Sequence, residues 1–470
     1  MTGLIDKTLH RLGGRLPGRV SMPGDDRYAA ATAIWPKPVG RMPRAVVHCR
    51  TAEDVQSAIR VARDGELPLS VRGGGHDWTG RALCDGIVID LSGMNDVVVD
   101  SDSRTAQISG GARASDVLAA TDPLGVAAVA GSVGAVGMTG LTLGGGYGAL
   151  IGRFGLALDN LLAAEVVLAD GRVVVATHDH EEELFWALRG GGGNFGVTAM
   201  RHRLHPLPSV RSGMLLFPFA EAKVALERAA EAAAATAEDL TVQLGCVAGP
   251  DGTPVVMVVP TWCGSPAEGE ARIAPFLKLG TLLAGAVDLK PYGVSLTFFD
   301  PYLAHGQPTF METCWLPALD SASIDVFIQA MAGVPPGCAI FTHEFKGAAS
   351  RVPAEATAFG LRRDHVLVEI LATFVDRSDK LEEQRYRQWT KATRRAFDAM
   401  ALPGGYPNLL TGGDLDRAAK SYGPNAERLI RAKHHYDPDN VFRSAIPLPV
   451  GQDNGASTRL TKNLPRRNRL

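Results

Sequence analysis

The sequence lacks the features that mark several large protein classes. Its six cysteines stand singly, without a CxxC pair, which argues against a structural zinc site or a redox pair. The formal net charge is -2 over 470 residues, so no basic surface for nucleic acid or anionic lipid is indicated. No apolar run approaches the roughly 18 residues of a membrane span, and MTGLIDKTLHRLGGRLPG has no apolar core of the signal-peptide type. We therefore expect a cytoplasmic protein with reduced thiols and with no metal, nucleic-acid or membrane partner.

Glycine is the residue in excess. The chain has 53 glycines, which cluster at 73–75, 131–148 and 190–196. Because glycine has no Cβ, another molecule can approach its backbone closely, and a run of bare N–H groups forms a concavity suited to phosphates. Three such clusters predict a long, flat, polyanionic ligand. Ordinary turns are the alternative for any one cluster.

Hydrophobic periodicity predicts two folded parts. From about residue 45 to 200, short β-type runs alternate with helical ones. One helix, TAEDVQSAIRVARDG, should begin after the N-cap Thr51 and end at Gly65. Two prolines in LHPLPSV, near residue 205, indicate a boundary. Beyond it, strands such as TPVVMVVPTW mix with long helices, which fits an open sheet with helices over one face.

Familiar nucleotide and hydrolase motifs fail on their context. GGGGNFG matches GxGxxG at Gly191, Gly193 and Gly196, but a helical pattern precedes it and a strand pattern follows it. A Rossmann fold requires the reverse order. No P-loop sequence GxxxxGK[ST] occurs. Around Ser132, AGSVG lacks the first glycine and the following helix of a nucleophile elbow.

Taken together, the glycine clusters resemble one family. PLSVRGGGHDWTG, DGIVIDLSGMN, VGMTGLTLGGGYGALIGRFGLALDNLLAAEVVLADG and LFWALRGGGGNFGVT are similar to the FAD-binding domain of the berberine bridge enzyme-like oxidases. These belong to the p-cresol methylhydroxylase/vanillyl-alcohol oxidase superfamily. YPNL and YGPNAERLIRAKHHYDPDNVFR resemble the family's C-terminal segment. Bacterial members of the 6-hydroxy-D-nicotine oxidase type look nearest.

The resemblance implies an α+β fold. A PCMH-type FAD-binding domain of two α/β subdomains would span residues 1–204. A substrate-binding domain, an antiparallel sheet covered by helices, would span residues 205–410. Residues 411–450 would return to the FAD domain, and we expect the polar, basic residues 451–470 to be disordered.

For the cofactor, the resemblance implies FAD bound by backbone N–H groups of the loop 72–77. His76 would carry a covalent bond to the 8α-methyl group of the isoalloxazine, a role suited to a neutral imidazole. Many relatives have a second tether, a cysteine, where this chain has Val133, so we expect a single bond. The implied cofactor-binding positions are Arg72, Gly73, Gly74, Gly75, His76, Asp77, Val136, Gly137, Gly140, Gly146, Asp159, Val197, Tyr406 and Asn408.

Substrate oxidation also releases a proton that a side chain must take. In DHVLVEILATFVD, Glu369 is an acid within an otherwise apolar strand. A buried carboxylate is costly, which favours a catalytic base over a solvent-facing edge residue. In relatives the matching strand faces the flavin, and several have a lysine where this chain has Leu367. Tyr406 and Asn408 match the family's Y-x-N element, which contacts the flavin and the substrate. We expect Tyr406 to be catalytic; the alternative is that it is an aromatic residue that only packs.

The resemblance also bears on the substrate and the electron acceptor. Phe298, Phe310 and Met311 are the predicted pocket walls, although core packing is the commoner fate of such residues. A hydroxyl-poor pocket favours a small, largely apolar or aromatic metabolite of alkaloid, polyketide or phenol type over a sugar. Val136 occupies the position that controls oxygen access in relatives, which favours an oxidase using O2 and producing H2O2. A dehydrogenase of the same fold and a flavin-bearing drug-binding protein are the alternatives. We expect a monomer or homodimer.

Overall fold

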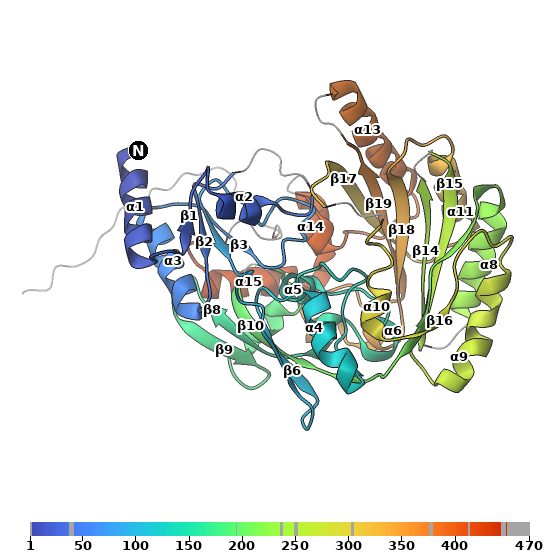
Figure 1. Ribbon diagram of the computed structural model, residues 1–470, viewed down its shortest axis with the longest axis horizontal. Coiled ribbons are helices and arrows are strands. Elements are labelled where there is room, and N and C mark those ends of the chain that lie inside the picture. The colour runs from blue at the N-terminus through green and yellow to red at the C-terminus, as the bar shows by residue number, and fades with distance from the viewer. Residues whose placement is uncertain are drawn as a thin grey trace, which may run out of the picture.

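The computed structural model describes residues 2–36, 42–193, 195–235, 238–248, 252–301, 305–375, 379–411, 414–442 and 448. Figure 1 shows two lobes side by side. We call them the N-terminal lobe, built on strands between Val20 and Arg203, and the C-terminal lobe, built on strands between Val210 and Thr373. The predicted disordered tail, 451–470, lies outside the described residues.

The N-terminal lobe has two main sheets, of which the first is mostly parallel. Its strand order is β1-β2-β4-β3, with β2, β4 and β3 parallel to one another. The α3 helix joins β2 to β3 and packs against α1. As predicted, the Thr51 side chain caps α3 by accepting the Asp54 N–H, and the helix ends at Gly65. These elements are α1 (Thr2–Arg15), β1 (Val20–Ser21), α2 (Asp26–Thr32), β2 (Ala45–His48), α3 (Ala52–Asp64), β3 (Leu69–Arg72) and β4 (Ile87–Asp90).

The second sheet of this lobe is antiparallel, in the order β5-β6-β10-β8-β9. The β8–β9 hairpin turns at Gly171, whose φ of +87° favours glycine. Its strands are β5 (Val97–Asp100), β6 (Thr105–Ser109), β8 (Leu161–Val167), β9 (Val173–Thr177) and β10 (Gly196–Arg203). The associated helices are α4 (Ala114–Thr121), α5 (Met138–Gly144), α6 (Ile151–Phe154) and α7 (Glu182–Leu188). A short pair joins β7 (Val126–Ala127) to β11 (His205–Pro206), at the predicted boundary near 205.

The C-terminal lobe is a large antiparallel sheet in the order β16-β12-β15-β14-β18-β19-β17, with β13 added on β15. Its strands are β12 (Val210–Ser212), β13 (Leu215–Pro218), β14 (Leu240–Ala248), β15 (Pro254–Trp262), β16 (Asp288–Lys290), β17 (Thr309–Leu316), β18 (Cys338–Phe345) and β19 (His365–Thr373). The helices of this part are α8 (Ala222–Ala234), α9 (Pro266–Ile273), α10 (Tyr292–Ser295), α11 (Ser321–Met331), α12 (Ala348–Arg351) and α13 (Lys380–Ala396).

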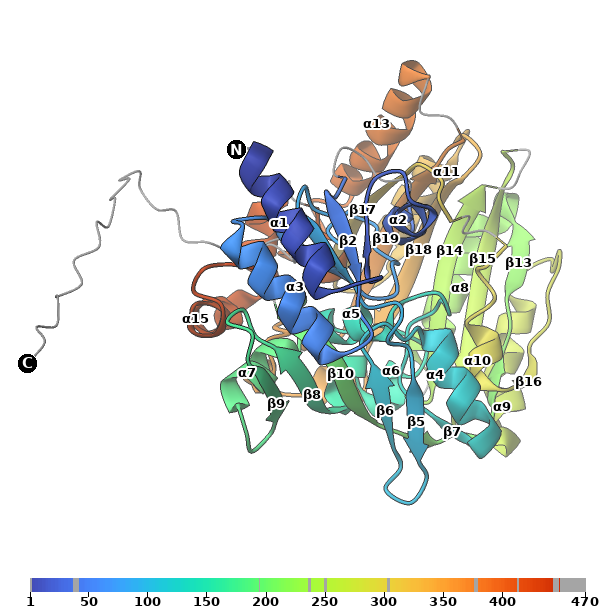
Figure 2. The same ribbon diagram turned by 60° about the vertical axis from the view of Figure 1, so that its left-hand side comes forward.

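Helices cover one face of the large sheet (Figure 2). Cys246, Ile340 and Ile370 point into a core shared with α8, α11 and α13. Because side chains alternate along a strand, their neighbours point to the other face, which is turned toward the N-terminal lobe. The sheet is therefore anchored on its helix side and presents its second face to the space between the lobes.

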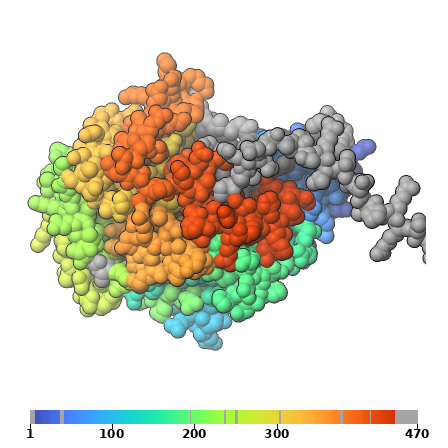
Figure 3. All heavy atoms as spheres, turned by 180° about the vertical axis from the view of Figure 1, so that it is seen from behind, coloured from blue at the N-terminus to red at the C-terminus, as the bar shows by residue number. Residues whose placement is uncertain are grey.

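The last described helices return to the N-terminal lobe. The α14 (Leu415–Ser421) and α15 (Ala426–Tyr436) helices follow the large sheet, and α15 contacts α7. Arg428 forms an ion pair with Glu183, and the Tyr436 hydroxyl donates to Glu181. Figure 3 shows this red segment lying against the green N-terminal lobe on the rear face. The α+β architecture with a helix-covered antiparallel sheet is thus confirmed.

None of the described helices is long and apolar enough to cross a membrane.

Candidate functional site

A cavity of about 310 Å³ lies where the two lobes meet. The N-terminal lobe contributes the loops that begin at Gly73 and Gly131, and the sheet of the C-terminal lobe contributes β14, β18 and β19. Tyr406 and Asn408, from the segment after α13, complete the wall. Predicted site residues from distant parts of the sequence, among them His76, Glu369 and Tyr406, therefore meet at one place, whereas Gly146 lies outside the cavity lining. Within the described ranges, no group of three or more His, Cys, Asp or Glu side chains is placed to hold a metal.

The two glycine loops touch through their backbones. A Cβ on Gly74 would lie 2.5 Å from the Gly137 Cα, and one on Gly137 would lie 2.6 Å from the Gly74 nitrogen. Gly75 has a φ of +77°, and a Cβ there would lie 2.9 Å from the Arg72 guanidinium. On the cavity side, by contrast, a Cβ on Gly140 would meet nothing within 4 Å. Glycine thus closes the contact between the loops and leaves bare backbone toward the cavity.

Arg72 supports the first loop from beneath and does not line the cavity. Its Nη1 donates to the Asp90 carboxylate at 2.9 Å, and both side chains are buried. Although burial opposes ionisation of Asp90, hydrogen bonds from His48 and Ser92 and the charge of Arg72 hold its pKa below the usual range. The buried, hydrogen-bonded ion pair of Arg72 and Asp90 therefore supports the loop.

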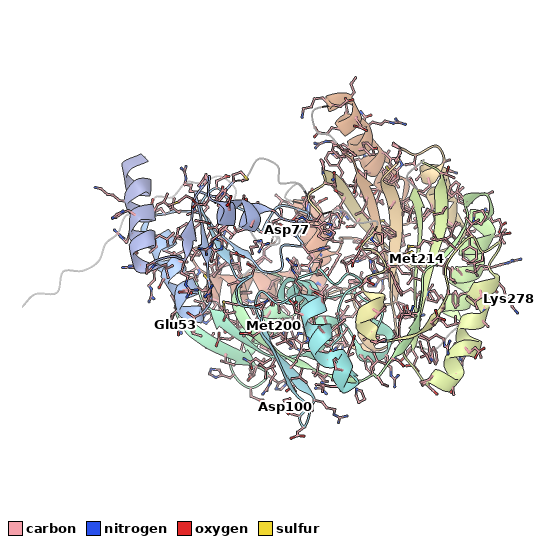
Figure 4. The ribbon with its side chains drawn as sticks, in the orientation of Figure 1. Glu53, Asp77, Asp100, Met200, Met214 and Lys278 are labelled. Atoms are coloured by element: carbon pink, nitrogen blue, oxygen red, sulfur yellow. The ribbon has the colours of Figure 1, made fainter. Side chains whose placement is uncertain are left out.

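Asp77 lies in the region between the lobes (Figure 4). One carboxylate oxygen accepts from the Thr79 N–H and hydroxyl, each at 2.9 Å. The other accepts from the Ala82 N–H at 2.7 Å. Although Asp77 lines the cavity, its carboxylate holds the turn that follows the glycines.

His76 ends the glycine loop and packs in a cluster with two tryptophans, Trp35 and Trp78, whose ring centroids are 5.9 Å apart. Its ring centroid is 4.1 Å from that of Trp35 and 5.6 Å from that of Trp78. Its Nδ1 is buried without a hydrogen-bond partner among the described residues. Burial, together with nearby His305 and Arg113, lowers the pKa of His76 to about 3. The imidazole is therefore neutral at physiological pH.

Among the other predicted cofactor positions, Val136 and Val197 line the cavity, whereas Asp159 does not. The Asp159 carboxylate accepts two hydrogen bonds from the Arg362 guanidinium, at 2.8 and 2.9 Å. Arg362 comes from the turn before β19, so this buried pair joins the two lobes. Asp159 supports the site from a distance.

Tyr406 is buried and its hydroxyl oxygen accepts two hydrogen bonds. The Gly146 N–H donates at 3.1 Å and Asn408 Nδ2 at 3.0 Å, while Asn408 Nδ2 also donates to the Gly140 carbonyl at 3.1 Å. The ring packs edge-on against Tyr147, with centroids 4.9 Å apart. Burial raises the pKa of Tyr406 to about 12, so the phenol keeps its proton. Because both bonds use the oxygen as acceptor, that proton remains available to a ligand.

A polar row crosses three strands on the cavity face of the large sheet. Glu369 on β19, His343 on β18 and Gln243 on β14 form it. His343 Nε2 lies 3.3 Å from Glu369 Oε1 and 3.4 Å from Gln243 Nε2. With a proton on Nε2 the imidazole can donate to the carboxylate; without one it can accept from the amide. This nitrogen therefore lies within reach of both an acceptor and a donor.

Sequence reasoning missed His343 and Gln243. The signal was present, because each is a polar residue in an apolar strand pattern, as Glu369 is. Their proximity follows from register: Glu369 pairs with Phe341, two residues before His343 on the same face. Strand order and register could not be read from the sequence.

The remaining cavity walls are apolar. Phe299, Phe341 and Leu371 line the sheet side, and Trp78 and Val133 line the opposite side. Phe299 meets Phe341 edge-on, with ring centroids 5.7 Å apart. The polar row is therefore set in largely apolar surroundings.

The three predicted pocket residues lie behind these walls. Strand alternation sends Phe310 to the helix-covered face, where it stacks on Phe374 at 5.4 Å with Arg387 over its ring. Met311 is on the cavity face and Phe298 nearby, but both pack into the cluster beside the cavity. Phe299, the neighbour of Phe298, is the aromatic residue that reaches the cavity.

A second cavity of about 30 Å³ adjoins the first and shares His343 and Gln243 with it. Its hydroxyl-bearing wall residues are Ser132, Ser212, Thr241, Thr261 and Ser295. This volume and polarity suit one or two buried water molecules. His343 therefore stands between the main cavity and a hydrophilic one.

The small cavity lies where β14 and β18 separate. Their backbone ladder ends at Phe341. Beyond it, the Thr342 hydroxyl accepts from the Leu244 N–H at 2.9 Å, and Glu344 accepts from the Val242 N–H at 2.7 Å. Side chains thus replace backbone partners and hold the two strands apart.

Comparisons with known proteins agree with this arrangement. Residues 43–177 match the FAD binding domain family and residues 398–449 match the "Berberine and berberine like" family. An uncharacterised FAD-linked oxidoreductase of Bacillus subtilis, YvdP, is 30% identical over 455 residues, covering 93% of this chain and 98% of that protein. (R)-6-hydroxynicotine oxidase of Paenarthrobacter nicotinovorans is 41% identical over 195 residues, 41% of this chain and 43% of that protein.

A solved structure extends the likeness to the whole fold. The crystal structure of 6-hydroxy-D-nicotine oxidase from Arthrobacter nicotinovorans superposes with a TM-score of 0.83 at 27% identity, covering 92% of this chain and 98% of that one. The shared fold places the glycine loops and the large sheet around one site. The chain belongs to the berberine bridge enzyme-like family of FAD-linked oxidoreductases.

Proposed function

We propose that this oxidoreductase is an oxidase that holds FAD covalently on His76 and oxidises a small, largely apolar or aromatic metabolite. O2 would be the electron acceptor and H2O2 the product. One observation carries the proposal. A single cavity has bare glycine backbone and neutral His76 on one side, and the Glu369–His343 pair in apolar walls on the other.

The residues present fit FAD. Gly140 and Gly193 line the cavity with open space where a Cβ would be, so a flat group can approach their backbone. The Thr139 hydroxyl and His76 Nδ1 are buried without partners among the described residues, and both residues line the cavity. When bound, FAD supplies the acceptor for two electrons from the substrate. Val133, apolar and buried, supports His76 as the sole tether.

Glu369 would take the proton that the substrate releases, with His343 as its hydrogen-bonded partner. Their side chains are about four-fifths buried, and the surrounding apolar walls exclude water. Tyr406 would donate its free proton to a polar group of the substrate and so orient it. The pocket thus suits an apolar ring that presents a single hydroxyl or amine to this polar row.

Two further parts of the proposal concern oxygen and the cell. Val136 is a small, partly exposed residue in the cavity wall, which supports access of O2. All six cysteines are buried, as suits reduced thiols, which supports a reducing, cytoplasmic location. A monomer or homodimer remains our expectation for the assembly.

Acid precipitation tests the covalent bond. The wild-type pellet should retain yellow flavin, whereas His76→Ala should bind FAD but release it into the supernatant. Flavin absorbance in both fractions is the measurement. Release of all flavin from the wild type would contradict the histidyl bond.

Anaerobic mixing tests the catalytic base. Alkaloids, phenols and polyketides are screened for bleaching of the flavin, with sugars as the contrasting class. For a substrate found in this way, Glu369→Gln should lower the bleaching rate about 10²- to 10⁴-fold while binding is kept. The control is Glu312→Gln, which changes an acid on neighbouring β17 outside the cavity. Equal effects of the two substitutions would remove Glu369 from the mechanism.

Photoreduced enzyme tests the acceptor. Mixed with air, its flavin should regain its oxidised spectrum rapidly and H2O2 should appear. Slow recovery would favour a dehydrogenase of the same fold. Tight binding of a screened compound without any bleaching would favour the drug-binding alternative.

A further inference from the structure

We propose that Trp35 is a positioning residue that orients the His76 imidazole for covalent attachment of FAD. This inference rests on the proposed histidyl bond. Trp35 precedes residues 43–177, the part that matches the FAD binding domain family, so no family match assigns it a role.

Trp35 is fixed from both sides of the site. The backbone N–H of Trp35 donates to the Gly75 carbonyl at 2.9 Å, and the backbone carbonyl of Trp35 accepts from the Gly306 N–H at 2.8 Å. The first bond joins it to the cofactor loop and the second to the segment before β17. Only 7% of Trp35 is exposed. Its indole therefore has a defined place relative to the residue that follows Gly75, which is His76.

The tryptophan contacts are the visible restraint on the His76 ring. Other site residues, such as Tyr406 and Asp77, are held by hydrogen bonds. His76 Nδ1 has no such partner among the described residues. The Trp35 ring centroid lies 4.1 Å from that of His76 at an interplanar angle of 45°, and the Trp78 centroid lies 5.6 Å away at 87°, so the two indoles contact the imidazole on adjacent sides. Packing, instead of hydrogen bonding, sets the ring's orientation.

Orientation matters because bond formation needs an aligned nucleophile. The new bond joins a ring nitrogen of His76 to the 8α carbon. One proton leaves that nitrogen, one leaves the methyl group, and the two electrons released pass through the flavin to O2, which becomes H2O2. The low pKa of His76, about 3, keeps the ring unprotonated for this attack. Trp35 contributes both to that burial and to the ring's direction.

The test compares holoenzymes of the wild type, Trp35→Ala, Trp35→Leu and Trp35→Phe. We expect Trp35→Ala and Trp35→Leu to bind FAD but to hold at least tenfold less of it in the acid pellet after a short incubation with excess FAD in air. Trp35→Phe, which keeps an aromatic ring, should retain most of the covalent flavin. Trp389→Ala is the matched control, because this half-buried tryptophan lies on α13, outside the cavity.

The outcomes separate the two proposals. Wild-type levels of covalent flavin in Trp35→Ala and Trp35→Leu would overturn the role of Trp35 and leave the histidyl bond intact. If Trp35→Ala fails to fold, by near-ultraviolet circular dichroism, the Leu and Phe variants decide: equal rates of attachment would overturn the role. Release of flavin from the wild type would remove the histidyl bond itself, and this inference with it.

Discussion

Some residues around the cavity matter because they lack a side chain, and others matter through the polar atoms of their side chains. Gly74 and Gly137 serve by having no side chain, since their loops meet backbone to backbone. His343 and Glu369 serve through atoms at the far ends of their side chains. We therefore expect the glycine-loop side of the cavity to be sensitive to added volume, and the side of the polar row to altered chemistry.

Gly74→Ala tests the first half of this division. Its Cβ would lie 2.5 Å from the Gly137 Cα, and backbone cannot move aside as a flexible side chain can. We expect a loss of about 1–3 kcal/mol in stability and a lower ratio of flavin to protein. Thermal unfolding and the visible spectrum measure both. Gly14→Ala, in the exposed part of α1 with nothing within 4 Å, is the control and should cost nothing.

Sequence patterns reached some site residues and not others. The glycine loops, His76, Glu369 and Tyr406 could be predicted because contiguous motifs carry them, and the structure brings them to one cavity. His343 was missed because its role depends on which strand lies beside β19. Phe310 was predicted to line the pocket but points to the helix-covered face, because side chains alternate along β17 and its neighbour Met311 is on the cavity face.

Among the elements, β14 and β18 are unusual because side chains complete their pairing. The Thr342 hydroxyl accepts from the Leu244 N–H at 2.9 Å and donates to the Leu244 carbonyl at 3.0 Å. A single hydroxyl thus occupies the place of a neighbouring strand's peptide group. The hydroxyl therefore pairs the Leu244 N–H and carbonyl where the two strands separate beside the small cavity.

Thr342→Val should reveal the value of this hydroxyl. Valine has nearly the same shape, but it leaves the Leu244 N–H and carbonyl without their partner. We expect a loss of about 1–3 kcal/mol in the free energy of unfolding, and faster hydrogen exchange at Leu244. Denaturant titration and exchange mass spectrometry provide the measurements. Thr297→Val, at an exposed helix end, should change neither quantity.

Local elements could be predicted well, whereas their assembly could not. The cap at Thr51 and the end of the same helix at Gly65 follow from local sequence signals. The order of strands in the large sheet depends on contacts between residues far apart in the chain, and no local pattern carries that information. The polar row of Glu369, His343 and Gln243 could therefore be recognised only in the structure.

At the scale of the whole molecule, buried histidines link folding to pH. His202 is fully buried and its pKa is lowered by burial from 6.5 to about 4. His365 is likewise buried, and burial lowers its pKa to about 3. Both rings are neutral in the folded protein and can take up a proton more readily when the chain unfolds.

Stability should therefore fall on acidification. Above pH 6.5 neither state binds a proton at these rings; between pH 6.5 and about 4 only the unfolded chain does, so the free energy of unfolding decreases there. Each fully buried histidine contributes up to about 3 kcal/mol over that window. Melting temperature measured against pH should show the fall, and His202→Gln should reduce its slope. A flat profile between pH 4 and 6.5 would contradict this account.

The division of the cavity walls has a consequence for how such a protein can change over time. On the proposed cofactor side, Gly74 and Gly137 leave no room for a side chain where their loops meet. On the proposed substrate side the wall is a set of side chains: Phe341 and Leu371 on strands whose opposite face packs against the helices of the lobe, and Phe299 in the turn after α10. Mutations in that set can exchange one substrate for another while the redox chemistry and the fold stay constant. We therefore expect the redox reaction to stay the same while the side chains that choose the substrate can be exchanged.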